Sequence, residues 1–437
     1  MTIQERLQSI PYWGFWLLLA YMPFHIFLAQ SVSLATGGLE AWKIGKDVVL
    51  ALLLVFTICL VYMQRKGTRA FWYVVAAAGV YAVIHLIVWA LNSDIYQRSA
   101  ILGIIYNNRL PGFAILGYGA YLLTPVKFVF SSVMKIVIAV STLVVVLGLL
   151  QYVLPKDILT HLGYSLERGA RPAFFIDDNP AFPRIMATLR EPNALGAYLL
   201  VPIALLTAYI TRVAGKKRLL VAGLLVLHVL VVFLTQSRSA WIALVVVLGL
   251  IVLWRYAAII QRLLRQWWPV VVGLSLLVIV AGWTQRNSTF VQQYIVHSNP
   301  EETANDLDSN DLHWKLAKEG LEGAAAQPLG HGPGTAGLVS IQNPDGGKLT
   351  ENYYIQLAYE IGWLGLALFI ALNVWLYRRL WRRHDVLGQV LCVAFWGYVV
   401  TNMLLHTWGN EAVAAQWWLL AGLAVALPAG IQKPTDD

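Results

Sequence analysis

The chain has 437 residues, of which 58% are hydrophobic and 13% are charged, and its mean hydropathy is +0.63. A water-soluble domain of this size does not tolerate so apolar a composition, so these values indicate an integral membrane protein. The net charge of +9 then reports how the chain is oriented in the bilayer, and it gives no reason to expect nucleic-acid binding.

Hydrophobic segments recur along the whole chain. A helix needs roughly 20 mostly apolar residues to cross a hydrocarbon core about 30 Å thick, and about twelve segments approach or reach this length. The predicted spans are 12–32, 48–63, 71–91, 110–123, 132–154, 193–211, 219–234, 239–254, 269–284, 353–377, 386–405 and 412–429. The sequence therefore predicts an all-α, polytopic membrane protein with about twelve transmembrane helices.

The basic residues predict the orientation of these spans. Lys and Arg concentrate in alternate loops, such as 65–69, 212–218 and 378–383, and cytoplasmic loops carry such an excess. Both termini are therefore expected in the cytoplasm. We predict three regions: residues 1–284 with helices 1–9 and the outer loop 155–192, residues 285–352 as an external region folded into short helices, and residues 353–437 with helices 10–12 and a cytoplasmic tail.

Metal and cofactor motifs are not found in the sequence. Cys59 and Cys392 both lie in predicted spans, which supports neither a disulfide framework nor a metal site. P-loop, dinucleotide-binding and HExxH patterns are missing as well. We therefore expect chemistry that uses no metal or cofactor and is driven by an energised substrate.

Three arginines lie at predicted outer ends of spans. Arg184 and Arg190 close the first long loop, just before Asn193 begins a span, and Arg238 lies in a tight turn between two hydrophobic runs. A guanidinium is permanently charged, and its planar fork of donors suits phosphate oxygens. The alternative is that Arg184 and Arg190 are interfacial anchors and that Arg238 extends to the membrane surface.

The second long loop carries the other candidate residues. Residues 311–320 read as a short amphipathic helix, and the Gly- and Pro-rich run 327–334, which contains His331, predicts a turn. Thr350 or Asn352 could cap the next helix, with Glu351 in its first turn. Glu351 is thus either a helix-start residue or a catalytic base, and His331 is either a proton-transfer group or a structural loop residue.

The order of these pieces resembles the bacterial O-antigen ligase and O-antigen polymerase superfamily of polytopic glycosyltransferases. The matching pieces are 184–193, the Thr-Gln-Ser-Arg-Ser-Ala turn at 235–240, the run from His313-Trp314 to 328–334, and Glu351-Asn352. The resemblance covers residues 182–366 and implies a GT-C-like fold. Ligases of this family typically carry a His where this chain has Glu351, and this departure leaves a polymerase or a related transferase more open than a lipid A core ligase.

The resemblance implies an enzyme of the bacterial inner membrane with an outward-facing active site. It would move a saccharide from polyprenyl pyrophosphate, such as undecaprenyl pyrophosphate, onto a glycan or glycolipid acceptor without a metal. Substrate binding would then fall to Arg184, Arg190, Arg238, Asn193 and Asn352, and proton transfer to Glu351 or His331.

Two other functions remain open from the sequence. A transporter of lipid-linked oligosaccharide or polysaccharide would need polar residues along a path through the bilayer. The predicted spans offer few, mainly Asn108, Arg109, Glu360 and Asn373. A multi-span polymerase of the peptidoglycan type is the other alternative.

Overall fold

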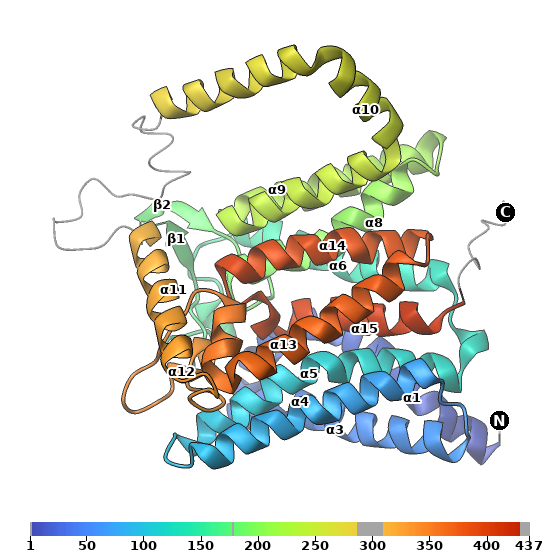
Figure 1. Ribbon diagram of the computed structural model, residues 1–437, viewed down its shortest axis with the longest axis vertical. Coiled ribbons are helices and arrows are strands. Elements are labelled where there is room, and N and C mark those ends of the chain that lie inside the picture. The colour runs from blue at the N-terminus through green and yellow to red at the C-terminus, as the bar shows by residue number, and fades with distance from the viewer. Residues whose placement is uncertain (1, 177–178, 286–308, 429–437) are drawn as a thin grey trace.

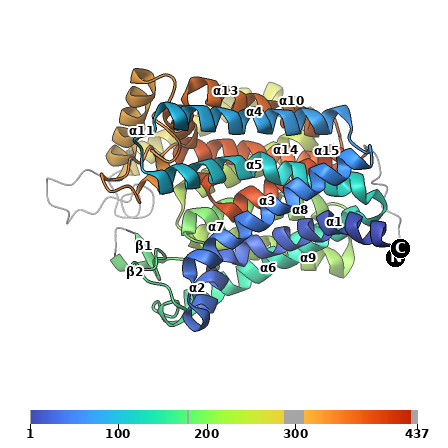
Figure 2. The ribbon, with the colours of Figure 1, turned by 90° about the horizontal axis from the view of Figure 1, so that it is seen from below.

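The structure is a computed structural model that describes residues 2–176, 179–285 and 309–428. Most of these residues form helices that lie side by side in a bundle (Figures 1 and 2), and the described strands form one two-stranded sheet. The predicted all-α, polytopic class is confirmed. Residues 286–308 of the predicted external region, and the last predicted residues of the cytoplasmic tail, lie outside the described residues.

The helices follow one another along the chain with short connections. In order they are α1 (Ile3–Tyr21), α2 (His25–Thr36), α3 (Leu39–Met63), α4 (Arg69–Leu91), α5 (Gln97–Leu123), α6 (Phe130–Val153), α7 (Pro192–Tyr198), α8 (Leu200–Ile210), α9 (Gly215–Leu234), α10 (Arg238–Gln285), α11 (Ser309–Ala326), α12 (Gly337–Ser340), α13 (Tyr353–Trp381), α14 (Val386–Leu404) and α15 (Glu411–Ala426).

Nine helical segments in the described part of the chain are long and apolar enough to cross a membrane. Two of them combine successive helices, α1 with α2 and α7 with α8. Two further predicted spans correspond to α5, which has 27 residues, and to the shorter apolar helix α15. The predicted spans 239–254 and 269–284 are joined without a break in α10, a 48-residue helix that arches over the bundle (Figure 1).

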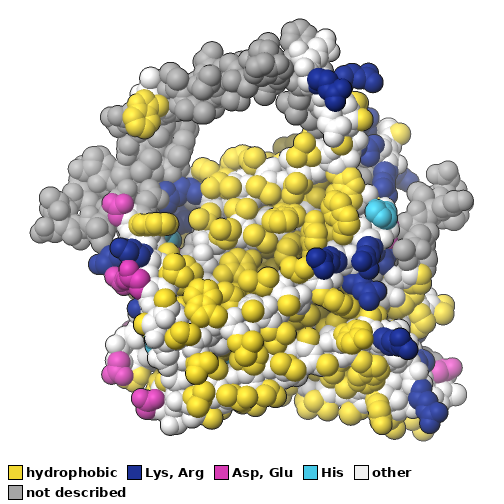
Figure 3. Space-filling model, in the orientation of Figure 1, with side chains coloured by type: hydrophobic (Ala, Val, Ile, Leu, Met, Phe, Trp, Pro, Cys, Tyr) yellow, Lys and Arg dark blue, Asp and Glu magenta, His cyan; other side chains and the backbone are white. Residues whose placement is uncertain are grey.

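The two ends of the bundle differ in composition. The basic loops 65–69, 212–218 and 378–383 lie at one end, with the start of α1 and the end of α15 (Figure 1). Both ribbon views place the strands and α11 at the opposite end, here called the loop end. On the face drawn in Figure 3, Lys and Arg gather away from the loop end, whereas most Asp and Glu lie near it.

The centre of the bundle depends on close contact between α5 and α15. A Cβ at Gly117 of α5 would collide with the backbone of Leu419, and a Cβ at Gly422 of α15 would collide with the backbone of Ala114. Small residues let membrane helices approach in this way, because van der Waals packing rather than the hydrophobic effect holds them together in lipid. This contact fixes the beginnings of both helices at the loop end.

The loop end carries the small sheet and the short helices. Strand β1 (Phe174–Ile176) pairs antiparallel with β2 (Asn179–Arg184), and Phe174 lies opposite Arg184. The sequence predicted a loop here, because strands this short and rich in proline show no alternating pattern. The predicted short helix at 311–320 is confirmed within α11, and α12 adds a single turn.

We expect Gly422→Ala to destabilise the protein by about 1–3 kcal/mol, the usual cost of overpacking a well-packed core. The added methyl group must push α15 away from α5. The measurement is the melting temperature in detergent. The control is Gly223→Ala in α9, where a Cβ would meet no atom within 4 Å. Equal melting temperatures for the two variants would contradict this account of the α5–α15 contact.

Candidate active site

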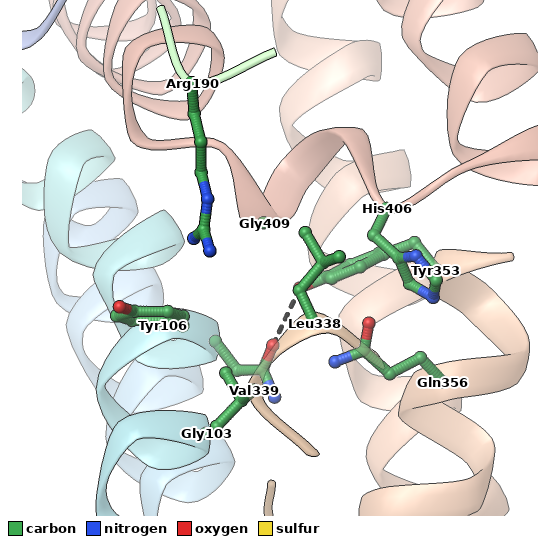
Figure 4. A pocket seen from close by; sticks show the side chains of 10 residues that line it. Gly103, Tyr106, Arg190, Leu338, Val339, Tyr353, Gln356, His406 and Gly409 are labelled. Carbon is green, nitrogen blue, oxygen red and sulfur yellow. Dashed lines mark hydrogen bonds between the residues drawn. The ribbon is translucent and has the colours of Figure 1, made fainter. Parts of the chain in front are cut away.

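A small cavity lies at the loop end, where segments distant in sequence meet (Figure 4). Its volume is about 20 Å³, which is room for about one water molecule. It is lined by Gly103, Tyr106 and Asn107 of α5, Arg190 before α7, Leu338 and Val339 of α12, Tyr353 and Gln356 of α13, and His406 and Gly409 between α14 and α15.

A chain of hydrogen bonds joins α5 to α13 beside this cavity. The Tyr353 hydroxyl donates to Asn107 Oδ1 at 3.0 Å, and Asn107 Nδ2 donates to Glu360 Oε2 at 3.0 Å. Gln356 Nε2 donates to the other carboxyl oxygen of Glu360 at 3.2 Å. Buried polar groups are costly unless they are hydrogen-bonded, so this chain holds the two helices in one relative position.

Helix α13 is interrupted directly after Glu360. Gly362 adopts φ 71° and, with Ile361, breaks the helical geometry. The Gly- and Pro-rich turn 327–334 fills this kink: the backbone N–H groups of His331 and Gly332 donate to Tyr359 O and Glu360 O at 2.8 and 3.0 Å. The predicted turn is confirmed, and its function is to satisfy carbonyl groups that the kink frees.

His331 lies against α13 in this turn. Its ring stacks on Tyr359 with centroids 3.9 Å apart and planes 5° apart, and Nδ1 lies 3.3 Å from Tyr359 O. Burial lowers the pKa of His331, the hydrogen bond to Tyr359 opposes this shift, and Lys348 adds to it. The described partners of His331 therefore hold it in the turn, and it is not among the residues that line the cavity.

Arg184 connects three of the segments singled out in the sequence. Its Nε donates to Thr235 O at 3.0 Å, and its Nη2 donates to Asn193 Oδ1 at 2.9 Å. It thus ties the end of β2 to the first turn of α7 and to the turn that leads to Arg238 at the start of α10. The structure brings Arg184, Asn193 and the 235–238 turn together.

Arg190 lies at the cavity and is exposed. Figure 4 shows its guanidinium directed toward Tyr106. Among the described residues it has no hydrogen-bond or ion-pair partner. Burial raises the pKa of the neighbouring Glu191, Arg190 and Arg184 oppose the shift, and Glu351 and Glu411 add to it. Arg184, Arg190, Glu351 and Glu411 therefore all lie within Coulombic range of Glu191 at the loop end.

Glu351 lies just outside α13, which corrects its expected place in the first turn. Asn352 is the N-cap, as one reading of the sequence had it: its Oδ1 accepts from the N–H groups of Tyr354 and Ile355 at 2.9 and 3.0 Å. Its amide also donates to Met403 O at 2.9 Å. The side chain of Glu351 is free of this capping function.

The Glu351 carboxylate has an imidazole partner. His313 Nδ1 of α11 lies 3.2 Å from Glu351 Oε2, and the Glu351 side chain is 18% exposed. Burial would raise the pKa of Glu351, but the hydrogen bond and charge of His313, together with His406, outweigh it and lower the pKa below its ordinary value. Glu351 is therefore an ionised group near neutral pH.

Three non-glycine residues at the loop end adopt left-handed backbone conformations. They are Ala187 with φ 51°, Gln236 with φ 51° and Glu351 with φ 47°. Each lies within or beside one of the sequence pieces that carry the family resemblance. A non-glycine residue in this region is strained by about 1–3 kcal/mol and persists only where its surroundings enforce it, which is common at functional sites.

A buried group of charges supports the turn between α14 and α15. Arg109 of α5 donates to Gly409 O, and its Nη2 and Nη1 lie 3.8 Å from Glu411 and 3.9 Å from Asp47. Lys46 Nζ lies 2.9 Å from Asp47. Because the two cations face two carboxylates, the group is neutral overall and holds α3, α5 and α15 together beside the cavity.

Several residues of this site could not be chosen from the sequence. His406 lies just past a predicted span, and the available signal was that four of the six residues 406–411, on the predicted outer side, are polar. Glu360 looked like an isolated polar residue within a span, Asn107 lies just before the predicted span 110–123, and only the fold pairs them. Within the described ranges, no three His, Cys, Asp or Glu side chains are grouped so that they could hold a metal ion.

Comparison with known proteins bears out the resemblance. Residues 223–370 match a family model described as O-Antigen ligase. The matched segment runs from α9 into α13 and contains Arg238, His331, Glu351 and Asn352. It supports membership of the O-antigen ligase and polymerase superfamily, and a role in ligating or polymerising glycans at a membrane. A search of curated proteins finds no match.

The lowered pKa of Glu351 predicts a pH-dependent contribution to stability. A carboxyl group with a depressed folded-state pKa stabilises the protein above its unfolded pKa, and this contribution is lost as pH falls through the folded value. Glu351→Gln should therefore lower the melting temperature at pH 7, and the difference from the parent should shrink below the ordinary Glu pKa of 4.5. A difference that does not change between pH 7 and pH 3.5 would rule out the ion pair with His313.

Proposed function

From this family match, we propose that the protein is a glycosyltransferase that moves a polyprenyl-pyrophosphate-linked saccharide onto an acceptor glycan, by polymerisation or ligation. The observation that supports it best is the arrangement of charge at the loop end. The Arg184 and Arg190 guanidinium groups and the Glu351 carboxylate all act on the pKa of Glu191, so all three lie within Coulombic range of that residue. Such a site can stabilise an anionic leaving group and remove a proton from an incoming hydroxyl.

In this proposal, the arginines stabilise the pyrophosphate of the donor. Breaking the bond between sugar and phosphate leaves negative charge on the pyrophosphate, and fixed cations stabilise that charge as it develops. Arg184 is preorganised by Asn193 and Thr235, whereas Arg190 reaches the cavity with no partner among the described side chains. Arg238, at the start of α10, belongs to the same clamp in this proposal.

In this proposal, Glu351, the base predicted from the sequence, promotes the loss of the proton from the acceptor hydroxyl. An in-line displacement at the sugar carbon needs the acceptor hydroxyl to lose its proton on the side opposite the pyrophosphate. The lowered pKa keeps Glu351 ionised at neutral pH, so that a negative charge is available without an activating metal. His331 is the other candidate from the sequence, and its stacking on Tyr359 favours a structural role.

The loop end faces outward in this proposal. The opposite end carries the basic loops 65–69, 212–218 and 378–383, and such loops remain in the cytoplasm. Nucleotide sugars are not available outside the inner membrane, so a lipid-linked donor such as undecaprenyl pyrophosphate glycan fits the location. Glu351 in place of the His of related ligases favours a polymerase or a related transferase.

A direct assay tests the proposed function. Purified protein in liposomes is incubated with undecaprenyl-pyrophosphate-linked oligosaccharide extracted from the source strain, with and without candidate acceptor glycans. We expect release of undecaprenyl pyrophosphate together with a lengthened or ligated glycan. Transbilayer movement of the intact donor without such release would identify a transporter and refute the proposal.

We expect Arg184→Ala and Arg238→Ala each to lower turnover by about 10²–10³-fold, because each removes a fixed donor to the developing phosphate charge. Lysine at either position should restore only part of the rate, since it lacks the planar fork. Arg190→Ala should mainly weaken donor binding. Arg69→Ala, an exposed arginine at the opposite end, is the control. Near-normal turnover in both alanine variants of Arg184 and Arg238 would exclude the clamp.

We expect Glu351→Gln to lower the rate by about 10²–10⁴-fold, the usual scale of loss when a side chain that promotes proton transfer is removed. The amide keeps the size of the side chain but removes its charge, and binding of undecaprenyl pyrophosphate should be retained. The rate is measured as release of that lipid. Glu322→Gln on α11, which is exposed, is the control. A Glu351→Gln protein as active as the parent would leave Glu351 with a purely structural role.

A further inference from the structure

His406 is a second titratable side chain beside Glu351. It lies in the turn between α14 and α15, is 8% exposed, and lines the cavity together with Arg190, Tyr353 and Gln356 (Figure 4). No function was predicted for it from the sequence. Its imidazole is thus buried at the wall of a cavity that Arg190, a cation without a described partner, also lines.

The hydrogen bonds of Thr350 determine which ring nitrogen of His406 carries the proton. The Thr350 hydroxyl donates to Asn352 O at 3.1 Å, and a hydroxyl has one proton to donate. Thr350 Oγ1 also lies 3.1 Å from His406 Nε2. With the hydroxyl proton directed to Asn352 O, Nε2 is the donor in this second bond. The neutral imidazole then has its lone pair on Nδ1.

The second ring nitrogen, Nδ1, is not enclosed by the protein. Among residues 2–176, 179–285 and 309–428, His406 Nδ1 has no hydrogen-bond partner, and it is not one of the buried polar atoms shut off from solvent. A hydroxyl group that enters the cavity could therefore donate to Nδ1 while Thr350 holds the ring in place.

Burial and the neighbouring charges act on the pKa of His406 in opposite directions. Burial lowers the pKa of His406 to about 4, Glu351 opposes this shift, and His313 of α11 adds to it. The other neighbours in the cavity are Arg190 and the uncharged Asn107, Tyr353 and Gln356. The imidazole is thus neutral at pH 7, and Glu351 is the neighbour whose charge favours the imidazolium.

We propose that His406 accepts the proton of the acceptor hydroxyl through Nδ1, with Thr350 as the positioning residue that fixes the ring. This rests on the proposed glycosyl transfer and explains how Glu351 contributes to it. The acceptor oxygen forms a bond to the sugar carbon as its O–H bond breaks and the proton passes to Nδ1. The bond from that carbon to the phosphate oxygen breaks, and its electron pair leaves with the pyrophosphate. The imidazolium then gives its proton to water.

Substitutions at His406 test this proposal in the donor-release assay. His406→Gln can keep the hydrogen bond to Thr350 but has no basic nitrogen, so we expect about a 10²–10⁴-fold loss in rate with undecaprenyl pyrophosphate binding retained. His406→Ala should be equally slow, and added imidazole and methylimidazoles should restore activity in proportion to their basicity. A residue with only a structural role would not produce that dependence.

Controls separate this proposal from the proposed function. Thr350→Ser should keep the rate and Thr350→Val should lower it, while His161→Gln, an exposed histidine of the first long loop, should have no effect. A parent protein that releases no undecaprenyl pyrophosphate refutes the proposed function itself. An active parent with an equally active His406→Gln variant, or a folded His406→Ala variant that no imidazole rescues, refutes only the function of His406.

Discussion

The arrangement of segments at the loop end depends on the hydrogen bonds that the carboxylate of Glu360 accepts. Glu360 is 0% exposed, and it accepts from Asn107 of α5, Gln356 of α13 and the backbone N–H of Ala336, the last at 3.4 Å. A carboxylate in an apolar interior is very costly unless its oxygens are satisfied. The chain must therefore bring α5, α13 and the segment before α12 to one point, and the cavity lies where they meet.

The kink in α13 follows from the same constraint. Glu360 is followed at once by Ile361 and Gly362, where the helix is interrupted and backbone carbonyls lose their helical partners. In a membrane protein such groups must find partners within the protein, and the turn 327–334 supplies them. The buried Glu360 and Gly362 thus fix the position of the turn 327–334. The need to pack this turn against the kinked backbone explains why it is rich in glycine.

The sequence predicted those features that depend on composition and local pattern. Span positions, the amphipathic helix at 311–320 and the capping function of Asn352 all follow from hydropathy, periodicity and the preference for short polar side chains at helix starts. The sequence could not predict contacts between distant residues, such as Arg184 with Thr235 or His313 with Glu351. It did not show that the predicted spans 239–254 and 269–284 are joined in one helix, α10, because a basic stretch inside a continuous helix looks like a loop.

The arginines near the cavity and the Glu351 carboxylate come from different segments of the chain. This separation explains how a carboxylate can occupy the position where related ligases carry a His. Arg184 and Arg190 come from the segment before α7, whereas Glu351 and His406 come from the ends of α13 and α14, so cationic and proton-accepting groups approach from different elements. A carboxylate next to His313 is a weak base, since its pKa is lowered. It is well suited to stabilise a neighbouring imidazolium, and His406, whose Nε2 lies 3.1 Å from the Thr350 hydroxyl oxygen, is the proposed proton acceptor.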